Sequence, residues 1–265
     1  MTETSLLNNS AETMNPIMKR LRGYNVIAGV AHLVQAVIIL ILANSFALGV
    51  KADYMAGPPG STTPRQIVEL FNVRVAWLVA LFFLLSAFAH FFVSGPGWGR
   101  YTKDLSRSRN PYRWLEYSVS SSIMIILIAL ITGINDVAAL VALAGVNASM
   151  IGFGWLQERL ESPGGGWWPF VVGCFAGIVP WVAIGIYLIA PGANQHAPGF
   201  VYGIFISLFI FFNIFALNQW LQYAQKGKWK NYLVGERAYI TLSLVAKSLL
   251  AWQIFASTLA PSSGN

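Results

Sequence analysis

The segment from Ser162 to Gln225 contains no Asp, Glu, Lys or Arg, and this absence is the strongest constraint on the fold. Two Pro/Gly clusters, at residues 190–192 and 198–199, divide the segment into apolar runs from Trp168 to Ile189 and from Gly199 to Tyr223. Each run is long enough to cross the hydrocarbon core of a bilayer as a helix. Only 10% of the whole chain is charged, whereas soluble domains carry about 25%. We therefore predict an integral membrane protein.

The same reasoning predicts seven spans in all. The other five apolar runs are bounded by charges or by Gly, Pro and Asn, and they extend from Tyr24 to Leu48, from Phe71 to Ser94, from Tyr112 to Thr132, from the turn at 133–136 to Gln157, and from about Tyr232 to Ala260. The polar connection at residues 51–63 is long enough to hold ordered structure of its own. We expect an all-α bundle at residues 19–260, a flexible tail at residues 1–18 and a C-terminal tail at residues 261–265.

Basic residues predict the orientation of the bundle, because cytoplasmic loops are enriched in Lys and Arg. The basic residues before the first span, and those after the second, fourth and sixth spans, all fall on one side. The opposite loops carry only Lys51, Arg65 and Arg74, partly balanced by Asp53 and Glu69. We therefore expect the N-terminus in the cytoplasm and the C-terminus outside the cell. The net charge of +7 is interpreted in the same way, and not as a sign of nucleic-acid binding.

One charge lies in the middle of the last apolar run, at Lys247. A lysine near the centre of a membrane costs from about 3 to more than 10 kcal/mol, so it is usually paired, modified or functional. Ser243 lies one turn before it and Ala251 one turn after it, which leaves space around the amine. Two interpretations are open: a lysine that forms an imine, or a lysine neutralised by an acid on a neighbouring helix, as in many transporters.

Glu116 is the acid that could reach this lysine. It lies closer to the cytoplasmic surface than Lys247, and the two meet if the third helix starts earlier, near residues 107–109, and the lysine points inward. Glu116 would then be the only carboxylate within reach, with Ser120 on the same helix face. The alternative is an interfacial Glu116 that pairs with Arg113.

His32 and His90 are the other ionisable residues at membrane depth, each about 12 Å inside the cytoplasmic end of its span. They are interpreted either as a functional polar pair or as packing residues. Asn147 is expected to turn its amide toward the interior, with Met150 one turn along. The single cysteine, Cys174, excludes an internal disulfide and a multi-thiolate metal site.

An aromatic set in the last three spans is interpreted first as bundle packing, although it also suits an elongated apolar ligand. The set consists of Trp181, Phe205, Phe209, Phe212 and Trp252.

Several stretches of the sequence resemble heliorhodopsins, seven-helix retinal-binding proteins with an inverted topology. The stretches are residues 27–32 (IAGVAH), 113–122 (RWLEYSVSSS), 145–150 (GVNASM), 177–181 (GIVPW), 235–239 (GERAY) and 244–248 (LVAKS). The similarity extends over nearly all of residues 20–260. It implies a rhodopsin-like bundle in the cell membrane.

The resemblance also implies residue roles. Lys247 would carry all-trans-retinal as a protonated Schiff base, with Glu116 as its counterion. Ser243 stands where pumping rhodopsins place a second acid. The region that hydrogen-bonds the Schiff base and accepts its proton would consist of Ser243, His32, His90 and Ser120. The retinal pocket would be lined by Tyr117, Ser121, Asn147, Met150, Trp181, Phe209 and Phe212.

We therefore expect a light-sensing photoreceptor that does not pump ions, because the outer half of the bundle holds no titratable group between Lys247 and its mouth. We also expect a homodimer, a cytoplasmic signalling partner and no enzymatic activity. Two alternatives remain open: light-driven or light-gated ion transport with the same chromophore, and a solute transporter in which Lys247 and Glu116 form an ordinary ion pair.

Overall fold

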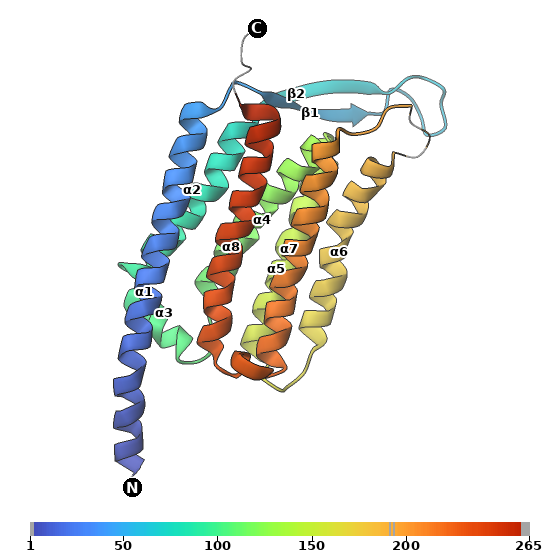
Figure 1. The fold of residues 1–265 in the computed structure, drawn as a ribbon. Helices are drawn as coiled ribbons and strands as arrows, with labels where there is room; N and C mark the ends of the chain where they lie inside the picture. Colours follow the sequence, from blue (N-terminus) through green and yellow to red (C-terminus); the bar gives the residue numbers. More distant parts are fainter. Residues whose placement is uncertain (1–2, 191, 193, 261–265) are drawn as a thin grey trace.

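The computed structural model describes residues 3–190, 192 and 194–260. Within these residues, seven helices are long and apolar enough to cross a membrane, as predicted, and they stand side by side in one bundle (Figure 1). Two short helices, α3 (Trp98–Leu105) and the 3-10 helix η1 (Gly227–Lys230), lie in connections. The long helices are α1 (Glu3–Leu42), α2 (Val75–Ser94), α4 (Pro111–Ile131), α5 (Val137–Leu160), α6 (Trp168–Ile189), α7 (Gly199–Tyr223) and α8 (Tyr232–Ile254), which continues into a π-helix, η2 (Phe255–Leu259).

α6 and α7 have the predicted limits, and the Pro/Gly clusters lie at the end of α6 and at the start of α7. Ala190 follows α6 in the left-handed conformation, with φ 44°, and so turns the chain out of the helix. Pro198 precedes α7 with an extended ψ of 150°. Pro180 lies inside α6, where it removes one backbone hydrogen bond.

The polar connection after α1 forms an antiparallel hairpin of two strands, β1 (Ala47–Tyr54) and β2 (Gln66–Arg74). Val50 and Ala52 lie on the same face of β1 and are buried. The backbone N–H of Lys51 donates to the carbonyl of Asn135, 2.8 Å away in the turn before α5. The hairpin is therefore attached to the end of the bundle, and it is the one sheet in the described part of an otherwise helical fold.

The hairpin corrects two predicted span limits. α1 ends at Leu42 rather than Leu48, and α2 begins at Val75 rather than Phe71. Leu48 and Phe71 are apolar, but both belong to strands that continue into polar sequence. Hydropathy alone does not distinguish such residues from the end of a helix.

The predicted early start of the third membrane helix is wrong. Residues 106–110 form a connection in which Ser108 adopts a left-handed conformation with φ 55°. α4 begins at Pro111, and the side chain of Asn110 caps it by accepting a hydrogen bond from the backbone N–H of Arg113 at 3.1 Å. Proline at the first helical position and asparagine at the cap are both favoured there.

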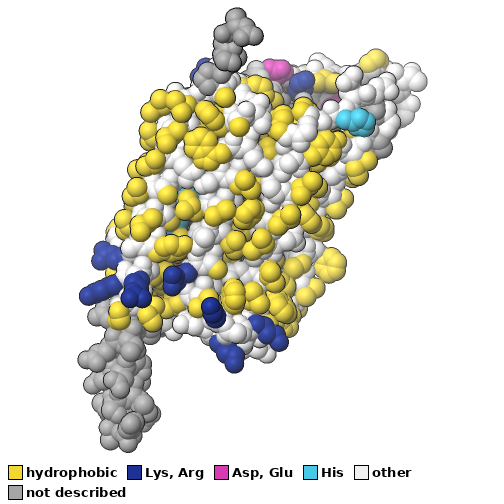
Figure 2. Space-filling model, in the orientation of Figure 1, with side chains coloured by type: hydrophobic (Ala, Val, Ile, Leu, Met, Phe, Trp, Pro, Cys, Tyr) yellow, Lys and Arg dark blue, Asp and Glu magenta, His cyan; other side chains and the backbone are white. Residues whose placement is uncertain are grey.

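The two ends of the bundle differ in charge. The hairpin lies at one end, whereas α3, η1 and the first residues of α4 and α8 lie at the other, which we call the basic end (Figure 1). Lys and Arg side chains gather toward the basic end, and hydrophobic side chains cover the bundle between the ends (Figure 2). α1 begins at Glu3, inside the segment at residues 1–18 that was predicted to be a flexible tail, and the flexibility of that segment stays a prediction. The predicted C-terminal tail, residues 261–265, lies outside the described residues.

The interior is divided along its length. The largest cluster of buried apolar side chains occupies the half near the hairpin and includes Val79, Phe82, Leu127, Ile128 and Ile254. The buried ionisable side chains lie at the level of Lys247 or toward the basic end, and they include His32, Arg113, Glu158, Glu236 and Lys247. The half of the bundle nearer the basic end therefore holds the groups that can carry chemistry.

Candidate functional site

Lys247 of α8 and Glu116 of α4 form a buried ion pair. The Lys247 Nζ lies 3.1 Å from Glu116 Oε1, and the two side chains are only 4% and 9% exposed. The amine also donates to Ser243 Oγ at 2.8 Å, one turn back on α8. The lysine therefore leans toward the basic end, and this reach meets Glu116 without an earlier start of α4.

Two further groups hold the pair in place. Ser86 of α2 donates its hydroxyl to Glu116 Oε1 at 2.7 Å, so the same carboxylate oxygen accepts from both Ser86 and Lys247. The Lys247 ammonium lies 5.2 Å from the ring centroid of Tyr117, close enough for a cation–π interaction. Three helices thus fix one charge and its partner.

The two predicted histidines stack on each other beside this pair. Their ring centroids are 5.5 Å apart and their planes differ by 13°. His90 Nδ1 lies 2.8 Å from Asn25 Oδ1, whereas both ring nitrogens of His32 are buried without a hydrogen-bond partner in the described part of the chain. His90 lies one turn beyond Ser86 on α2, so the histidines and the ion pair share that helix.

An apolar cavity of about 110 Å³ begins at Lys247. It extends between α4, α5, α6, α7 and α8. Seven of the residues that the sequence analysis assigned to the site line it: Tyr117, Ser120, Ser121, Met150, Phe212, Ser243 and Lys247. The Ser120 hydroxyl is buried there, and no described residue hydrogen-bonds to it.

Three predicted pocket residues do not line this cavity. Asn147 is buried and donates to Ser121 Oγ at 2.7 Å, so it supports a lining residue from behind. Trp181 belongs to the largest hydrophobic cluster, and the partly buried Phe209 packs edge-on against it, with ring centroids 5.5 Å apart. In this structure Trp181 and Phe209 pack within the bundle, and their role as retinal-pocket residues stays a prediction. Residues that the sequence analysis did not name also line the cavity, among them Trp114, Phe170, Phe215, Gln219 and Tyr239.

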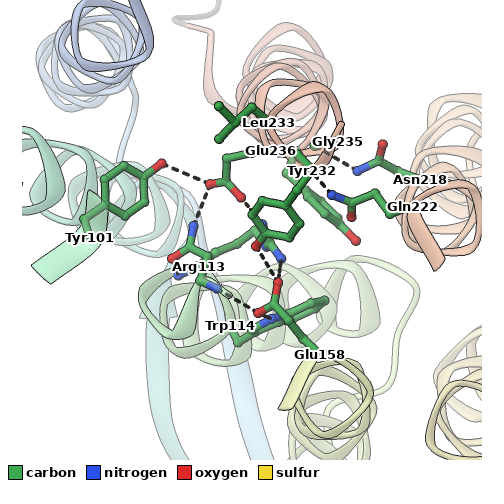
Figure 3. Close-up of polar contacts among 12 residues, drawn as sticks. Tyr101, Arg113, Trp114, Glu158, Asn218, Gln222, Tyr232, Leu233, Gly235 and Glu236 are labelled. Atoms are coloured by element: carbon green, nitrogen blue, oxygen red, sulfur yellow. Dashed lines mark hydrogen bonds and ion pairs between the residues drawn. The ribbon is translucent and has the colours of Figure 1, made fainter. Parts of the chain in front are cut away.

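A second polar cluster, centred on Arg113, was missed (Figure 3). The guanidinium of Arg113 donates to Glu158 of α5 at 2.8 Å and also to Glu236 of α8. The interfacial pairing of Arg113 with Glu116 is therefore wrong. All three residues of this cluster lie close to span ends, where charged residues are normally expected in water or at headgroups, so hydropathy gave no signal that they are buried.

Further donors complete this cluster. Tyr101 of α3 donates to Glu236 at 3.1 Å, Tyr232 donates to Glu158 at 2.5 Å, and the indole N–H of Trp114 donates to Glu158 at 2.5 Å (Figure 3). Burial, together with the neighbouring Glu236 carboxylate, raises the pKa of the Tyr101 phenol well above its usual value. Tyr101 therefore stays a hydrogen-bond donor over the physiological pH range.

A polar cavity of about 40 Å³ connects the two charged groups of residues. Glu116, Arg113 and Glu236 all contribute to its wall, together with His90. Tyr117 lines this polar cavity and the apolar cavity, so its ring separates the two. Its hydroxyl donates to the backbone carbonyl of Tyr239 at 2.9 Å, which holds the ring in that position.

Solved structures share the fold at low sequence identity. The transmembrane domain and linker region of Salpingoeca rosetta rhodopsin phosphodiesterase has 13% identity and a TM-score of 0.63 over 93% of this chain and 74% of that one. Exiguobacterium sibiricum rhodopsin has 17% identity and a TM-score of 0.59, over 89% and 94% of the two chains. A light-driven proton pump from Leptosphaeria maculans has 12% identity and a TM-score of 0.61, also over 89% and 94%. These likenesses establish the rhodopsin fold alone.

Comparison with curated proteins finds no match. The family model named Heliorhodopsin, in contrast, matches residues 21–259, which is nearly the whole chain. The seven membrane-length helices and the rhodopsin fold agree with that match. The chain is therefore a multi-pass integral membrane protein that belongs to the heliorhodopsin family.

Proposed function

We propose that this protein is a light-sensing photoreceptor that binds all-trans-retinal on Lys247 as a protonated Schiff base, with Glu116 as its counterion. Membership of the heliorhodopsin family supports a retinal-binding, light-responsive membrane protein. The observation that carries the residue assignment is the buried Lys247–Glu116 ion pair at one end of the apolar cavity, with 3.1 Å between amine and carboxylate. Retinal, when bound, would supply light absorption and isomerisation.

The residues around the apolar cavity fit such a ligand. A polyene needs apolar and aromatic walls, and Met150, Phe212, Phe215 and Tyr239 provide them. An aldehyde needs one amine at the end of the cavity, and Lys247 is the only lysine among its lining residues. The Lys247 amine is buried in the described structure, so a Schiff base formed on it would be shielded from bulk water.

The chain's own residues also suit the control of a proton at the Lys247 nitrogen. Glu116 supplies a negative charge next to this nitrogen, and the Ser86 hydroxyl donates to the same carboxylate oxygen and fixes its position. Ser243 accepts from the amine at 2.8 Å where a second acid would otherwise stand. The stacked His32 and His90 lie within the same region and are proposed to take part when this nitrogen loses its proton.

The absence of ionisable groups beyond Lys247 supports sensing rather than pumping. Within the described helices, residues 33–42, 75–85, 117–131 and 248–259 lead from the level of Lys247 to the hairpin end and contain no Asp, Glu, Lys, Arg or His. A proton that left the site toward the hairpin would find no side chain to carry it. We propose that the basic end faces the cytoplasm, as the distribution of Lys and Arg predicts.

The remaining assignments complete the proposal. We propose a homodimer and a cytoplasmic signalling partner that docks on the basic end, where residues 100–113 and 226–237 carry most of the positive charge. The protein is proposed to have no enzymatic activity. The likeness to a rhodopsin phosphodiesterase covers that protein's transmembrane domain and linker region, so it transfers no catalytic activity to this chain.

The deciding experiment is an absorption spectrum of the purified protein after all-trans-retinal is added, followed by illumination in hydroxylamine. A visible band that bleaches to the retinal oxime supports the Schiff base. A folded protein without a visible band refutes the proposal and makes the solute-transporter alternative the leading one. A photocurrent in expressing cells that is abolished by Glu116→Gln would replace the sensor with an ion transporter.

A further inference from the structure

A third hollow lies at the surface of the basic end, close to the Arg113 cluster. This groove is lined by Asp104 and Arg109 near the start of α4, and by Trp155, Glu158 and Arg159 of α5. Arg109, Trp155 and Arg159 are exposed, whereas Glu158 is only 4% exposed. The groove therefore leads from the surface of the protein to a buried carboxylate.

The groove and the polar cavity meet at Arg113. Glu158 contributes to the groove, whereas Arg113, Glu236 and Glu116 contribute to the wall of the polar cavity. Arg113 donates to Glu158 on one side and to Glu236 on the other. The direct route for water from the groove to the counterion Glu116 consequently passes these two ion pairs.

The arrangement closes this route in two ways. First, the guanidinium is sealed between aromatic rings, with its central carbon 4.0 Å from the ring centroid of Tyr239 and 4.7 Å from that of Trp114. Second, an arginine keeps its positive charge at every physiological pH. It therefore repels hydronium ions and does not pass a proton from one neighbour to the other, as carboxylates and waters do.

The same ion pairs hold several helices together. Arg113 lies on α4, Glu158 on α5 and Glu236 on α8, and Tyr101 of α3 donates to Glu236. A relative displacement of α8 against α4 or α5 would separate the guanidinium from at least one carboxylate. Because a buried charge that loses its partner must be solvated, water would then enter from the groove.

We propose that Arg113, Glu158 and Glu236 form a closed gate that controls the exchange of water and protons between the groove and the cavity of Glu116. When the gate opens, a proton from water in the groove binds the Glu116 carboxylate, and the reverse step returns it to water. The inference rests on the proposed function, because the protonation of Glu116 is measured through the absorption band of retinal bound to Lys247. The ionisable groups that face the gate, the groove or the counterion are Tyr101, Asp104, Arg109, Tyr112, Tyr117, Arg159, Tyr223, Tyr232, Tyr239, His32, His90 and Lys247.

The test measures how fast the counterion responds to bulk pH. The retinal-loaded protein is mixed with acid in a stopped-flow spectrometer, and the shift of the visible band as Glu116 is protonated gives the rate. Glu158→Gln removes one charged partner of Arg113, and Tyr232→Phe removes only a hydroxyl that donates to Glu158. We expect either variant to respond about 10- to 100-fold faster than the unmodified protein, since a hydrogen bond to a charged group changes an equilibrium by roughly that factor.

Glu161→Gln is the matched control, because Glu161 lies three residues from Glu158 and its carboxylate accepts from the backbone N–H of Gly166, whereas Arg113 pairs with Glu158. Its rate should equal that of the unmodified protein. Exchange of the Schiff-base proton in heavy water, followed by the C=N stretching frequency, gives a second measurement on the same four proteins. If Glu158→Gln does not fold, the rate at which the band of Tyr232→Phe shifts after acid is added decides whether the gate exists.

The results separate the gate from the proposed function. A chain that forms no pigment refutes the proposed function before the gate is tested. A pigment whose gate variants respond at the unmodified rate, or an unmodified protein that responds within the mixing time, overturns the gate alone. Equal acceleration by Glu161→Gln also overturns it, because the effect would then be a general change of surface charge.

Discussion

Substitution of the counterion, Glu116→Gln, should shift the visible absorption band of the retinal-loaded protein to longer wavelength. The glutamine keeps the shape and one oxygen acceptor, but it removes the negative charge 3.1 Å from the Lys247 nitrogen. At that separation and an effective dielectric constant of about 20, the attraction between the two charges is about 5 kcal/mol. The substitution therefore removes a large electrostatic interaction with little change in packing.

The size of the band shift depends on how much of this energy differs between the two electronic states. Light absorption moves positive charge away from the nitrogen, so the anion stabilises the ground state more than the excited state. If about half of the charge moves away, the gap narrows by roughly 2.5 kcal/mol of the roughly 50 kcal/mol in a visible photon, which is a red shift of about 30 nm.

The assay is a visible spectrum of purified Glu116→Gln, with Glu161→Gln as the control for loss of a carboxylate elsewhere. The control should keep the original band. An unchanged band in Glu116→Gln would show that another group serves as counterion. A blue shift would show that the anion stabilises the excited state more than the ground state.

Three further outcomes are expected. Lys247→Ala should form no visible band with added retinal, and a full band in that variant would exclude the imine at this residue. Tyr232→Phe should lose the hydrogen bond to Glu158, at a cost of about 1.5 to 3 kcal/mol or roughly 3 to 12 °C in thermal unfolding, which a melting curve checks. Because the pKa of Tyr101 is raised in the folded state, this phenol contributes stability below about pH 10 that is lost as the pH rises further, so Tyr101→Phe should weaken the alkaline fall in melting temperature.

Sequence patterns predicted the membrane spans well where composition changes sharply. The end of α6 and the start of α7 match because Pro and Gly mark both positions. The limits near the hairpin were wrong because Leu48 and Phe71 are apolar strand residues, and hydropathy records polarity without recording backbone pairing. The start of α4 was wrong for a different reason: an earlier start was added to the lean of the lysine in order to bring Glu116 to Lys247, whereas the lean toward Ser243 alone closes that gap.

The candidate site was predicted where a residue stands out against an apolar background. Lys247 and Glu116 are such residues, and the structure places them in contact, although their roles as attachment site and counterion stay predictions. Arg113, Glu158 and Glu236 could not be recognised, because each lies near a helix end where charge is common. Which aromatic residues line the cavity was also beyond the sequence: Trp181 and Phe212 are in contact, yet only Phe212 faces the cavity.

The attachment of α8 at both ends has a mechanical consequence. At the hairpin end, the Asn44 amide donates to the carbonyls of Thr258 at 2.9 Å and Ala260 at 3.3 Å, and its backbone N–H donates to Leu259 at 2.9 Å. At the other end, Glu236 is bonded to Arg113. A helix that is attached at both ends and is displaced at its middle bends and does not slide along its axis. A change in ligand shape near the midpoint of α8 would therefore strain both attachments at once. The attachment made of ion pairs would be solvated by water before the one made of hydrogen bonds from Asn44 to backbone carbonyls.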